Sequence, residues 1–172
     1  MLVNFAHIRC YGRNQRLGGA GEQTPSECMF FISITRLRVR SIRFLPFFVL
    51  YTYRSLRQVK TSSGFQCGGL LADRSWTFWT MTAWDNQESM RRFMTTGSHG
   101  AAMPRLLNWC DEASVVHWEQ AEADLPSWTK ADQRMRASGR VSKVRNPSPR
   151  QATLTYRTPR VSTGVAIRPA KK

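Results

Sequence analysis

The segment from Trp76 to Trp84 constrains the fold most strongly, because tryptophan, phenylalanine and threonine make up most of it. These residue types favour a β-strand. Alternation places Trp76, Phe78 and Trp84 on one face of that strand, and Trp79 and Met81 on the other. A strand with large groups on both faces belongs in a sheet that is covered on both sides. The fold must therefore supply two apolar layers.

The other elements are predicted from the spacing of apolar residues. Strands are expected at residues 30–35, 65–71 and 114–120, one helix from Pro46 to about Lys60, and a broken helix at residues 86–111. The order β-α-β-β-α-β is that of a ferredoxin-like α+β fold, a four-stranded antiparallel sheet with both helices on one face. The second face then lacks a cover within the domain. A symmetric homodimer that buries this face twice would supply one.

Composition divides the chain into three parts. Residues 1–28 are rich in glycine and show no periodicity, which predicts a disordered N-terminal extension. Residues 29–125 form the expected ferredoxin-like α/β-barrel domain. Residues 126–172 hold prolines, twelve basic residues and only one acidic residue, which predicts a basic, proline-rich C-terminal arm. Within that arm a short helix is expected around residues 130–137.

Several classes of function have little support in the sequence. No apolar run is long enough for a membrane-spanning helix, and the N-terminus lacks a secretory signal, so we expect a cytoplasmic protein. The cysteines lack the C-x-x-C spacing of zinc sites. The basic charges of residues 130–172 are spread among prolines with few aromatics, so no specific nucleic-acid partner is expected. Weak contact of this arm with an anionic membrane remains open.

The segment from Trp84 to Met103 holds the candidate chemistry. Asp85 and Glu88 can form a capping box that starts a helix. A glycine breaks this helix, and Ser98 can cap a second one with His99 in its first turn. A helix N-terminus disfavours the imidazolium ion, so His99 is expected in the neutral form that accepts protons or binds metals. The alternative is that His99 merely fills the junction.

A substrate pocket is the second candidate feature. Aromatic and methionine side chains could enclose a flat apolar molecule between the helices and the sheet. The predicted lining residues are Phe48, Tyr51, Trp79, Met94, Met103, Trp109 and Trp118. The alternative is an ordinary aromatic core together with a dimer interface.

These residues carry a resemblance to a known family. The pattern consists of Trp84-Asp85, Ser89-Met90, Phe93, Thr96-Gly97, His99 and Ala102-Met103. It resembles the dimeric α/β-barrel superfamily, which contains the antibiotic biosynthesis monooxygenases, and within it the spheroidene monooxygenase-like bacterial proteins. The likeness in fold covers residues 29–122, whereas the motif itself covers only residues 84–103.

The resemblance implies oxygen insertion into a small hydrophobic substrate by a homodimer, with His99 as the catalytic residue. It also implies haem as a candidate cofactor and, if haem binds, His99 as its axial ligand. Other members of the superfamily work without a cofactor, so the cofactor stays unknown. Two further interpretations remain open. One is a non-catalytic ligand-binding protein of the same fold, and the other is a peripheral membrane protein that uses Phe44, Phe47 and Leu50 with the basic arm.

Overall fold

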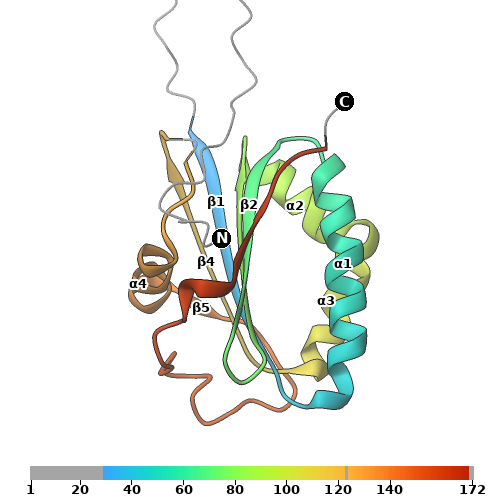
Figure 1. Cartoon of the computed structure of the whole chain (residues 1–172), viewed down its shortest axis with the longest axis vertical. Helices are drawn as coiled ribbons and strands as arrows, with labels where there is room; N and C mark the ends of the chain where they lie inside the picture. The colour runs from blue at the N-terminus through green and yellow to red at the C-terminus, as the bar shows by residue number, and fades with distance from the viewer. Residues whose placement is uncertain (1–28, 123, 171–172) are drawn as a thin grey trace, which may run out of the picture.

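The chain folds as an α+β protein around a six-stranded antiparallel sheet (Figure 1). The structure is a computed structural model, and it describes residues 29–122 and 124–170. Its elements are β1 (Phe30–Val39), η1 (Ile42–Phe44), α1 (Leu45–Thr61), β2 (Phe65–Asp73), β3 (Thr77–Trp84), α2 (Gln87–Thr95), α3 (Gly97–Trp109), β4 (Cys110–Gln120), α4 (Trp128–Ser138), β5 (Arg140–Val141), η2 (Val161–Thr163) and β6 (Gly164–Ile167). The predicted α+β class and the β-α-β-β-α-β order are confirmed.

The sheet has two more strands than predicted. Its order is β5-β4-β1-β3-β2-β6, with β1 in the centre between β3 and β4. Ile34 of β1 lies opposite Met81 on one side and Val116 on the other, and the pairing of β1 with β4 shifts register between Arg38 and Val39. The short strands β5 and β6 come from the C-terminal part of the chain and extend the two edges of the sheet. The disorder expected of residues 1–28 concerns residues outside those described.

Helices α1, α2 and α3 cover one face of the sheet, as the ferredoxin-like order predicts (Figure 1). In this article we call it the helix face. Trp84 is its most buried aromatic residue, and it contacts the rings of Phe65 and Phe93 at 5.3 Å between centroids. The buried cluster here comprises Phe31, Val59, Phe65, Trp84, Met90 and Ile167. Nearer the other end of α1, the Phe48 ring packs 4.7 Å from that of Phe78.

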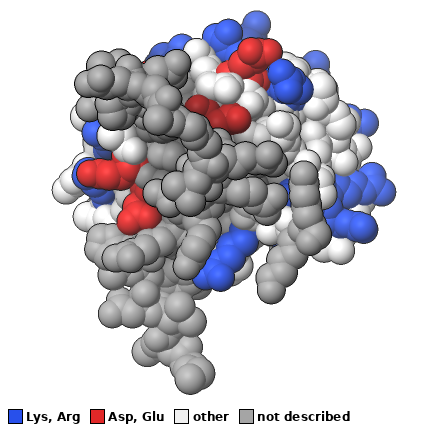
Figure 2. All heavy atoms as spheres, turned by 90° about the horizontal axis from the view of Figure 1, so that it is seen from above, with Lys and Arg blue, Asp and Glu red and all other residues white. Residues whose placement is uncertain are grey.

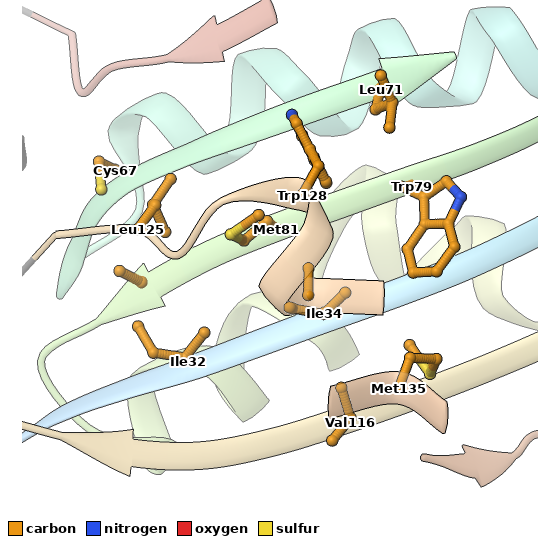
Figure 3. Close-up of a cluster of buried hydrophobic side chains, with 12 residues drawn as sticks. Ile32, Ile34, Cys67, Leu71, Trp79, Met81, Val116, Leu125, Trp128 and Met135 are labelled. Carbon is orange, nitrogen blue, oxygen red and sulfur yellow. The ribbon is translucent and has the colours of Figure 1, made fainter. Parts of the chain in front are cut away.

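Helix α4 covers the opposite face, which we call the α4 face (Figure 1). Trp128, Ala131 and Met135 recur at helical spacing and pack into one cluster with Trp79 and Met81 of β3 (Figure 3). Gly69 makes room for this packing, since a Cβ there would lie 3.2 Å from the Trp128 ring. The described part of residues 126–172 is thus no extended arm: it contains the predicted short helix and two strands. A fold that buries this face within one chain also removes the argument for a homodimer.

The described helices include none with both the length and the apolar character that a membrane crossing needs. Figure 2, seen from the top of Figure 1, shows lysine and arginine side chains at several separate places, with acidic side chains between some of them. The described basic residues on this side therefore form no single positive patch.

Candidate functional site

A cavity of about 330 Å³ lies between the helix face of the sheet and helices α1 and α3. Its volume is at the lower end of the range for small-molecule sites. No charged side chain of the described residues lines it, and most of the lining is apolar. The lining includes Leu37 of β1, Leu70 of β2, Phe78 of β3, Phe48, Tyr51, Ser55 and Leu56 of α1, and His99, Ala102, Leu106 and Trp109 of α3. An apolar molecule is the ligand that such walls favour.

The junction between α2 and α3 places His99 at this cavity. Helix α2 is capped by Asn86, whose side-chain oxygen accepts from the backbone N–H of Ser89 at 2.8 Å. The predicted cap, Asp85, lies one residue too early. Gly97 has a φ of 56°, a conformation that glycine adopts at little cost, and it turns the chain into α3. The N-cap of α3 is Thr96 rather than Ser98, and its side chain makes no capping bond. The predicted break and the place of His99 in the first turn are confirmed.

Gln58 of α1 holds this junction with its side-chain amide. Its Nε2 donates to the backbone carbonyl oxygens of Phe93 at 3.3 Å and Thr96 at 3.0 Å. Its Oε1 accepts from the backbone N–H of His99 at 3.0 Å. One residue of α1 thereby supplies hydrogen-bond partners for backbone groups at both the end of α2 and the start of α3. Sequence reasoning missed Gln58, because a single polar residue on a helix carries no local signal of a partner 41 positions away.

The His99 imidazole is held in one orientation. Its Nδ1 lies 3.1 Å from the backbone carbonyl oxygen of Met94, and its ring packs 4.5 Å from that of Phe93. Burial lowers the pKa of His99, and the bond to Met94 opposes that shift only in part. Because a carbonyl can only accept, the neutral ring carries its proton on Nδ1, and Nε2 keeps its lone pair. His99 can therefore accept a proton, or donate to a metal, through Nε2.

The structure brings five of the predicted site residues to the cavity: His99, Phe48, Tyr51, Trp79 and Trp109. The Tyr51 and Trp109 rings contact each other at 5.6 Å. Phe78 joins them, although it was absent from the predicted set. The alternation of β3 could have found it, because Phe78 shares a face with Trp84.

Trp79 lines the cavity from its strand, although its indole packs against Tyr156 on the α4 face. The three other predicted lining residues lie elsewhere. Met94 packs in the cluster around Trp84, and Met103 is 39% exposed to solvent. Trp118 packs against the α4-face cluster, where the Arg134 guanidinium lies 4.7 Å from its ring. Alternation along β4 places Trp118 on the α4 face, away from the cavity, and α3 turns Met103 outward.

The site offers a nitrogen donor that could bind haem iron, but the surrounding cavity does not suit a haem group. His99 offers a free nitrogen, as an axial ligand must. The cavity, however, is small for a porphyrin, and no cationic side chain of the described residues lines it to pair with the propionates. Among residues 29–122 and 124–170, no group of three or more His, Cys, Asp or Glu side chains could hold a bare metal ion. We therefore derive no step through haem or a metal.

Comparison with known proteins identifies likenesses in fold only. No family model matches the sequence, and no curated protein matches it. Solved structures with a similar fold include a proposed antibiotic biosynthesis monooxygenase from Nitrosomonas europaea, with 14% identity, a TM-score of 0.48, and coverage of 53% of this chain and 89% of that one. SnoaB, a cofactor-independent oxygenase from Streptomyces nogalater, has 16% identity and a TM-score of 0.38, and covers 53% and 90%. A conserved protein from Methanosarcina mazei Go1 has 10% identity and a TM-score of 0.47, and covers 54% and 93%.

Proposed function

We propose that this chain is a monooxygenase-like enzyme that binds a small hydrophobic molecule in the cavity beneath α1 and α3. The observation that carries the proposal is a single, oriented and neutral histidine, His99, at the wall of an otherwise apolar cavity. The resemblance of residues 84–103 to the monooxygenase-containing superfamily supports the reaction class.

Aromatic residues of the cavity would bind the substrate, and His99 would transfer a proton. Phe48, Phe78 and Tyr51 would hold the substrate by apolar contact and exclude water from it. His99 would accept a proton from a substrate hydroxyl through Nε2, since its lowered pKa keeps the imidazole neutral, with Nε2 unprotonated, near neutral pH. The resulting phenolate would supply the electrons to dioxygen: one oxygen atom would bond to a ring carbon, which loses its C–H bond and becomes a quinone carbonyl, and the second oxygen atom would leave as water. Gln58 would act as a positioning residue, because it fixes the backbone of His99.

Binding is tested first, with the fluorescent dye ANS as an apolar probe. Ala102 is buried at the cavity wall, whereas its neighbour Ala101 is exposed on the same helix. Ala102→Phe should fill the cavity and weaken dye binding at least tenfold, while Ala101→Phe should leave it unchanged. Thermal unfolding of both variants checks that they fold. Equal dye binding by a folded Ala102→Phe variant would place the apolar site elsewhere and refute the proposal.

Catalysis is tested separately from binding. Dioxygen consumption with a panel of apolar phenols should fall at least a hundredfold in His99→Gln, the loss typical of a missing general base, with dye binding retained. His117→Gln is the matched control, because His117 lies on β4 and does not line the cavity. Dye binding without any dioxygen consumption would favour the non-catalytic ligand-binding protein.

The haem-dependent version has its own readout. Addition of haem to the purified protein should give a Soret band that His99→Ala abolishes and His117→Ala preserves, if His99 is the axial ligand. The small cavity without cationic side chains leads us to expect no such band. A band that depends on His99 would show that α1 or α3 moves to admit the group.

A peripheral membrane protein is the second candidate, because α1 exposes apolar side chains to solvent. Phe47 is 55% and Leu50 43% exposed, and α1 holds basic but no acidic residues. Phe44 contributes less, since the Arg40 and Arg43 guanidinium groups cover its ring. Flotation with vesicles of an anionic lipid should be lost in Phe47→Ser/Leu50→Ser if this surface binds membranes. Deletion of the basic segment is unsuitable as a test, because it removes α4 from the core.

A further inference from the structure

A second cavity, of about 300 Å³, lies on the α4 face of the sheet and is polar. It is bounded by β1, by the turn between β2 and β3, and by the segment from Arg150 to Thr158. Its charged and polar side chains include Arg36, Arg74, Glu112, Arg150, Tyr156 and Arg157. None of these belongs to the cavity that holds His99.

Both carboxylates of this cavity already have cationic partners. Glu112 accepts from Arg36 at 2.7 Å and Arg38 at 2.9 Å, and it is 2% exposed. Asp73 accepts from the backbone N–H of Arg160 at 3.3 Å, and the Arg160 side chain lies 3.9 Å from it. Neither carboxylate is therefore available to neutralise the remaining arginines.

Three arginines of the cavity remain without an acidic partner. Within the described residues, Arg74, Arg150 and Arg157 take part in no ion pair, and all three are exposed at its rim. The cavity is therefore positively charged. A guanidinium group presents several N–H donors in a plane, which suits the oxygens of a phosphate group.

Two buried polar atoms at the inner wall also lack partners. Nε of Arg36 and the hydroxyl of Tyr156 form no hydrogen bond with any described residue, although Arg36 is only 5% exposed. The Tyr156 ring is fixed between the guanidinium groups of Arg36 at 4.0 Å and Arg136 at 4.2 Å. Burial and the nearby Asp132 carboxylate raise the pKa of Tyr156, so its hydroxyl stays protonated as a donor. That carboxylate already pairs with Arg136 at 3.1 Å, and the Tyr156 hydroxyl makes no hydrogen bond of good geometry with it. Unpaired buried donors of this kind call for a ligand or a water.

The turn at the rim has an uncommon backbone conformation. Ser75 and Trp76 both have a φ of 54°, and the N–H of Thr77 donates to the carbonyl oxygen of Arg74 at 3.2 Å. These features define a type I′ turn, which normally uses glycine or asparagine. Ser75 and Trp76 adopt a positive φ less readily than glycine or asparagine, so this turn costs conformational energy. It places Arg74 and Ser75 at the cavity, and a bond from Val39 N–H to the Trp76 carbonyl oxygen at 3.0 Å anchors it.

We propose that this cavity binds a small molecule through a phosphate or diphosphate group, with Arg74, Arg150 and Arg157 around the anion and Arg36 and Tyr156 beneath it. This site stands on its own observations and does not depend on the proposed oxygenase activity. The two cavities lie on opposite faces of the sheet, with Leu37 at one and its neighbours Arg36 and Arg38 at the other.

Isothermal titration of the full chain with inorganic pyrophosphate tests the proposal, at constant ionic strength in chloride. Arg150→Gln and Arg157→Gln should each weaken binding about tenfold, the usual value of a hydrogen bond to a charged group. Arg145→Gln is the matched control: it removes the same charge from an exposed position in the same segment, outside the cavity. The Arg145→Gln variant should bind pyrophosphate as tightly as the unaltered protein does.

Tyr156→Phe separates a binding role from a structural one. It keeps the ring between the two guanidinium groups and removes only the unpaired hydroxyl. Pyrophosphate binding should weaken, while the melting temperature holds or rises. No heat of binding at millimolar pyrophosphate, or equal weakening by Arg145→Gln, would overturn the proposal.

Competition then distinguishes the two sources of a phosphate group. Displacement of pyrophosphate by glycerol phosphate but not by vesicles of phosphatidic acid identifies a soluble ligand, and displacement by the vesicles alone identifies a lipid head group. Displacement by neither, at concentrations where pyrophosphate binds, would contradict recognition of phosphate esters.

Discussion

The two faces of the sheet are covered by different parts of the chain, and they are filled to different degrees. On the helix face, α1, α2 and α3 pack around Trp84 but leave an apolar cavity beside His99. On the α4 face, Trp79, Trp128 and Met135 fill the centre, and a buried ion-pair network lies at one end (Figure 3). One face thus has room for an apolar ligand, whereas the centre of the other has none.

The two faces therefore contribute differently to stability and to ligand binding. The α4 face holds the larger cluster of buried side chains, and such close packing tolerates little change in volume. The helix face is less closely packed, because it contains a cavity. Substitutions on the α4 face should therefore reduce stability, and substitutions around the His99 cavity should chiefly alter binding.

The largest effect is expected from Trp128→Ala on the α4 face. Trp128 is 6% exposed and contacts the sheet over Gly69, so its loss leaves a cavity in the core. The free energy of unfolding should fall by about 3–5 kcal/mol, measured by urea denaturation. Tyr53→Ala on α1, where Tyr53 is 58% exposed, is the control and should change it by less than about 0.5 kcal/mol. Similar losses in the two variants would show that α4 is not part of the core.

A second test concerns the ion-pair network beside that core. Glu112→Gln removes the charge that Arg36 and Arg38 share, and leaves Arg36 buried without a counter-ion. We expect a loss of about 3 kcal/mol. Glu88→Gln breaks the exposed pair with Arg92 and should cost at most about 0.5 kcal/mol. A Glu112→Gln variant as stable as Glu88→Gln would mean that the network contributes nothing to the fold.

Gln58→Leu tests the junction on the helix face. It removes the hydrogen bonds to the Phe93, Thr96 and His99 backbones, which should cost about 1–3 kcal/mol in total. Arg57→Leu, at an exposed position of the same helix, serves as the control. The positioning role predicts more than lost stability: the pKa of His99, followed by NMR, should rise towards its ordinary value. An unchanged pKa would leave Gln58 with a structural role alone.

The smallest effects should appear in the dependence of stability on pH, with opposite signs for the two faces. Burial lowers the pKa of His99 and His117, both on the helix face. Below their ordinary pKa of about 6.5 the unfolded chain binds protons that the folded chain does not, so stability falls as the pH decreases. Burial raises the pKa of Tyr156 on the α4 face, so stability falls as the pH rises above about 10.

Substitutions identify the groups responsible for the loss of stability at acid pH (the acid limb) and at alkaline pH (the alkaline limb). His99→Gln should flatten the acid limb and Tyr156→Phe the alkaline limb, in urea denaturation across the pH range. An acid limb that persists in full in the double variant His99→Gln/His117→Gln would assign it to other groups.

Local patterns were sufficient for most of the fold but not for its C-terminal part. The strands and α1 follow from alternation and from Pro46, whose effect is local. Helix α4 has a recognisable stripe in Trp128, Ala131 and Met135, but proline and basic residues around it suggested an arm. Its burial depends on Trp79, which lies far away in the sequence. Composition cannot report such a contact.

The candidate site shows the same division. His99 and the break before it were predictable, because glycine at a helix end is a local signal. The cap was misplaced by one residue, since Asp85 and Asn86 can both serve and only the backbone decides between them. Trp118 was assigned to the pocket from residue type alone, and the register of β4 places it on the α4 face. Trp79 does line the cavity, but its indole packs into the α4-face cluster.

The sequence by itself determined the order of the elements, the two apolar faces of β3 and the place of His99 at a helix break. These depend on periodicity and backbone preference, which act within a few residues. Three features required the tertiary structure: α4 covers the second face, Gln58 holds His99, and five arginines line one cavity together with Tyr156. Each of these depends on contacts between distant segments, and the free energy of such contacts exists only once the chain has folded.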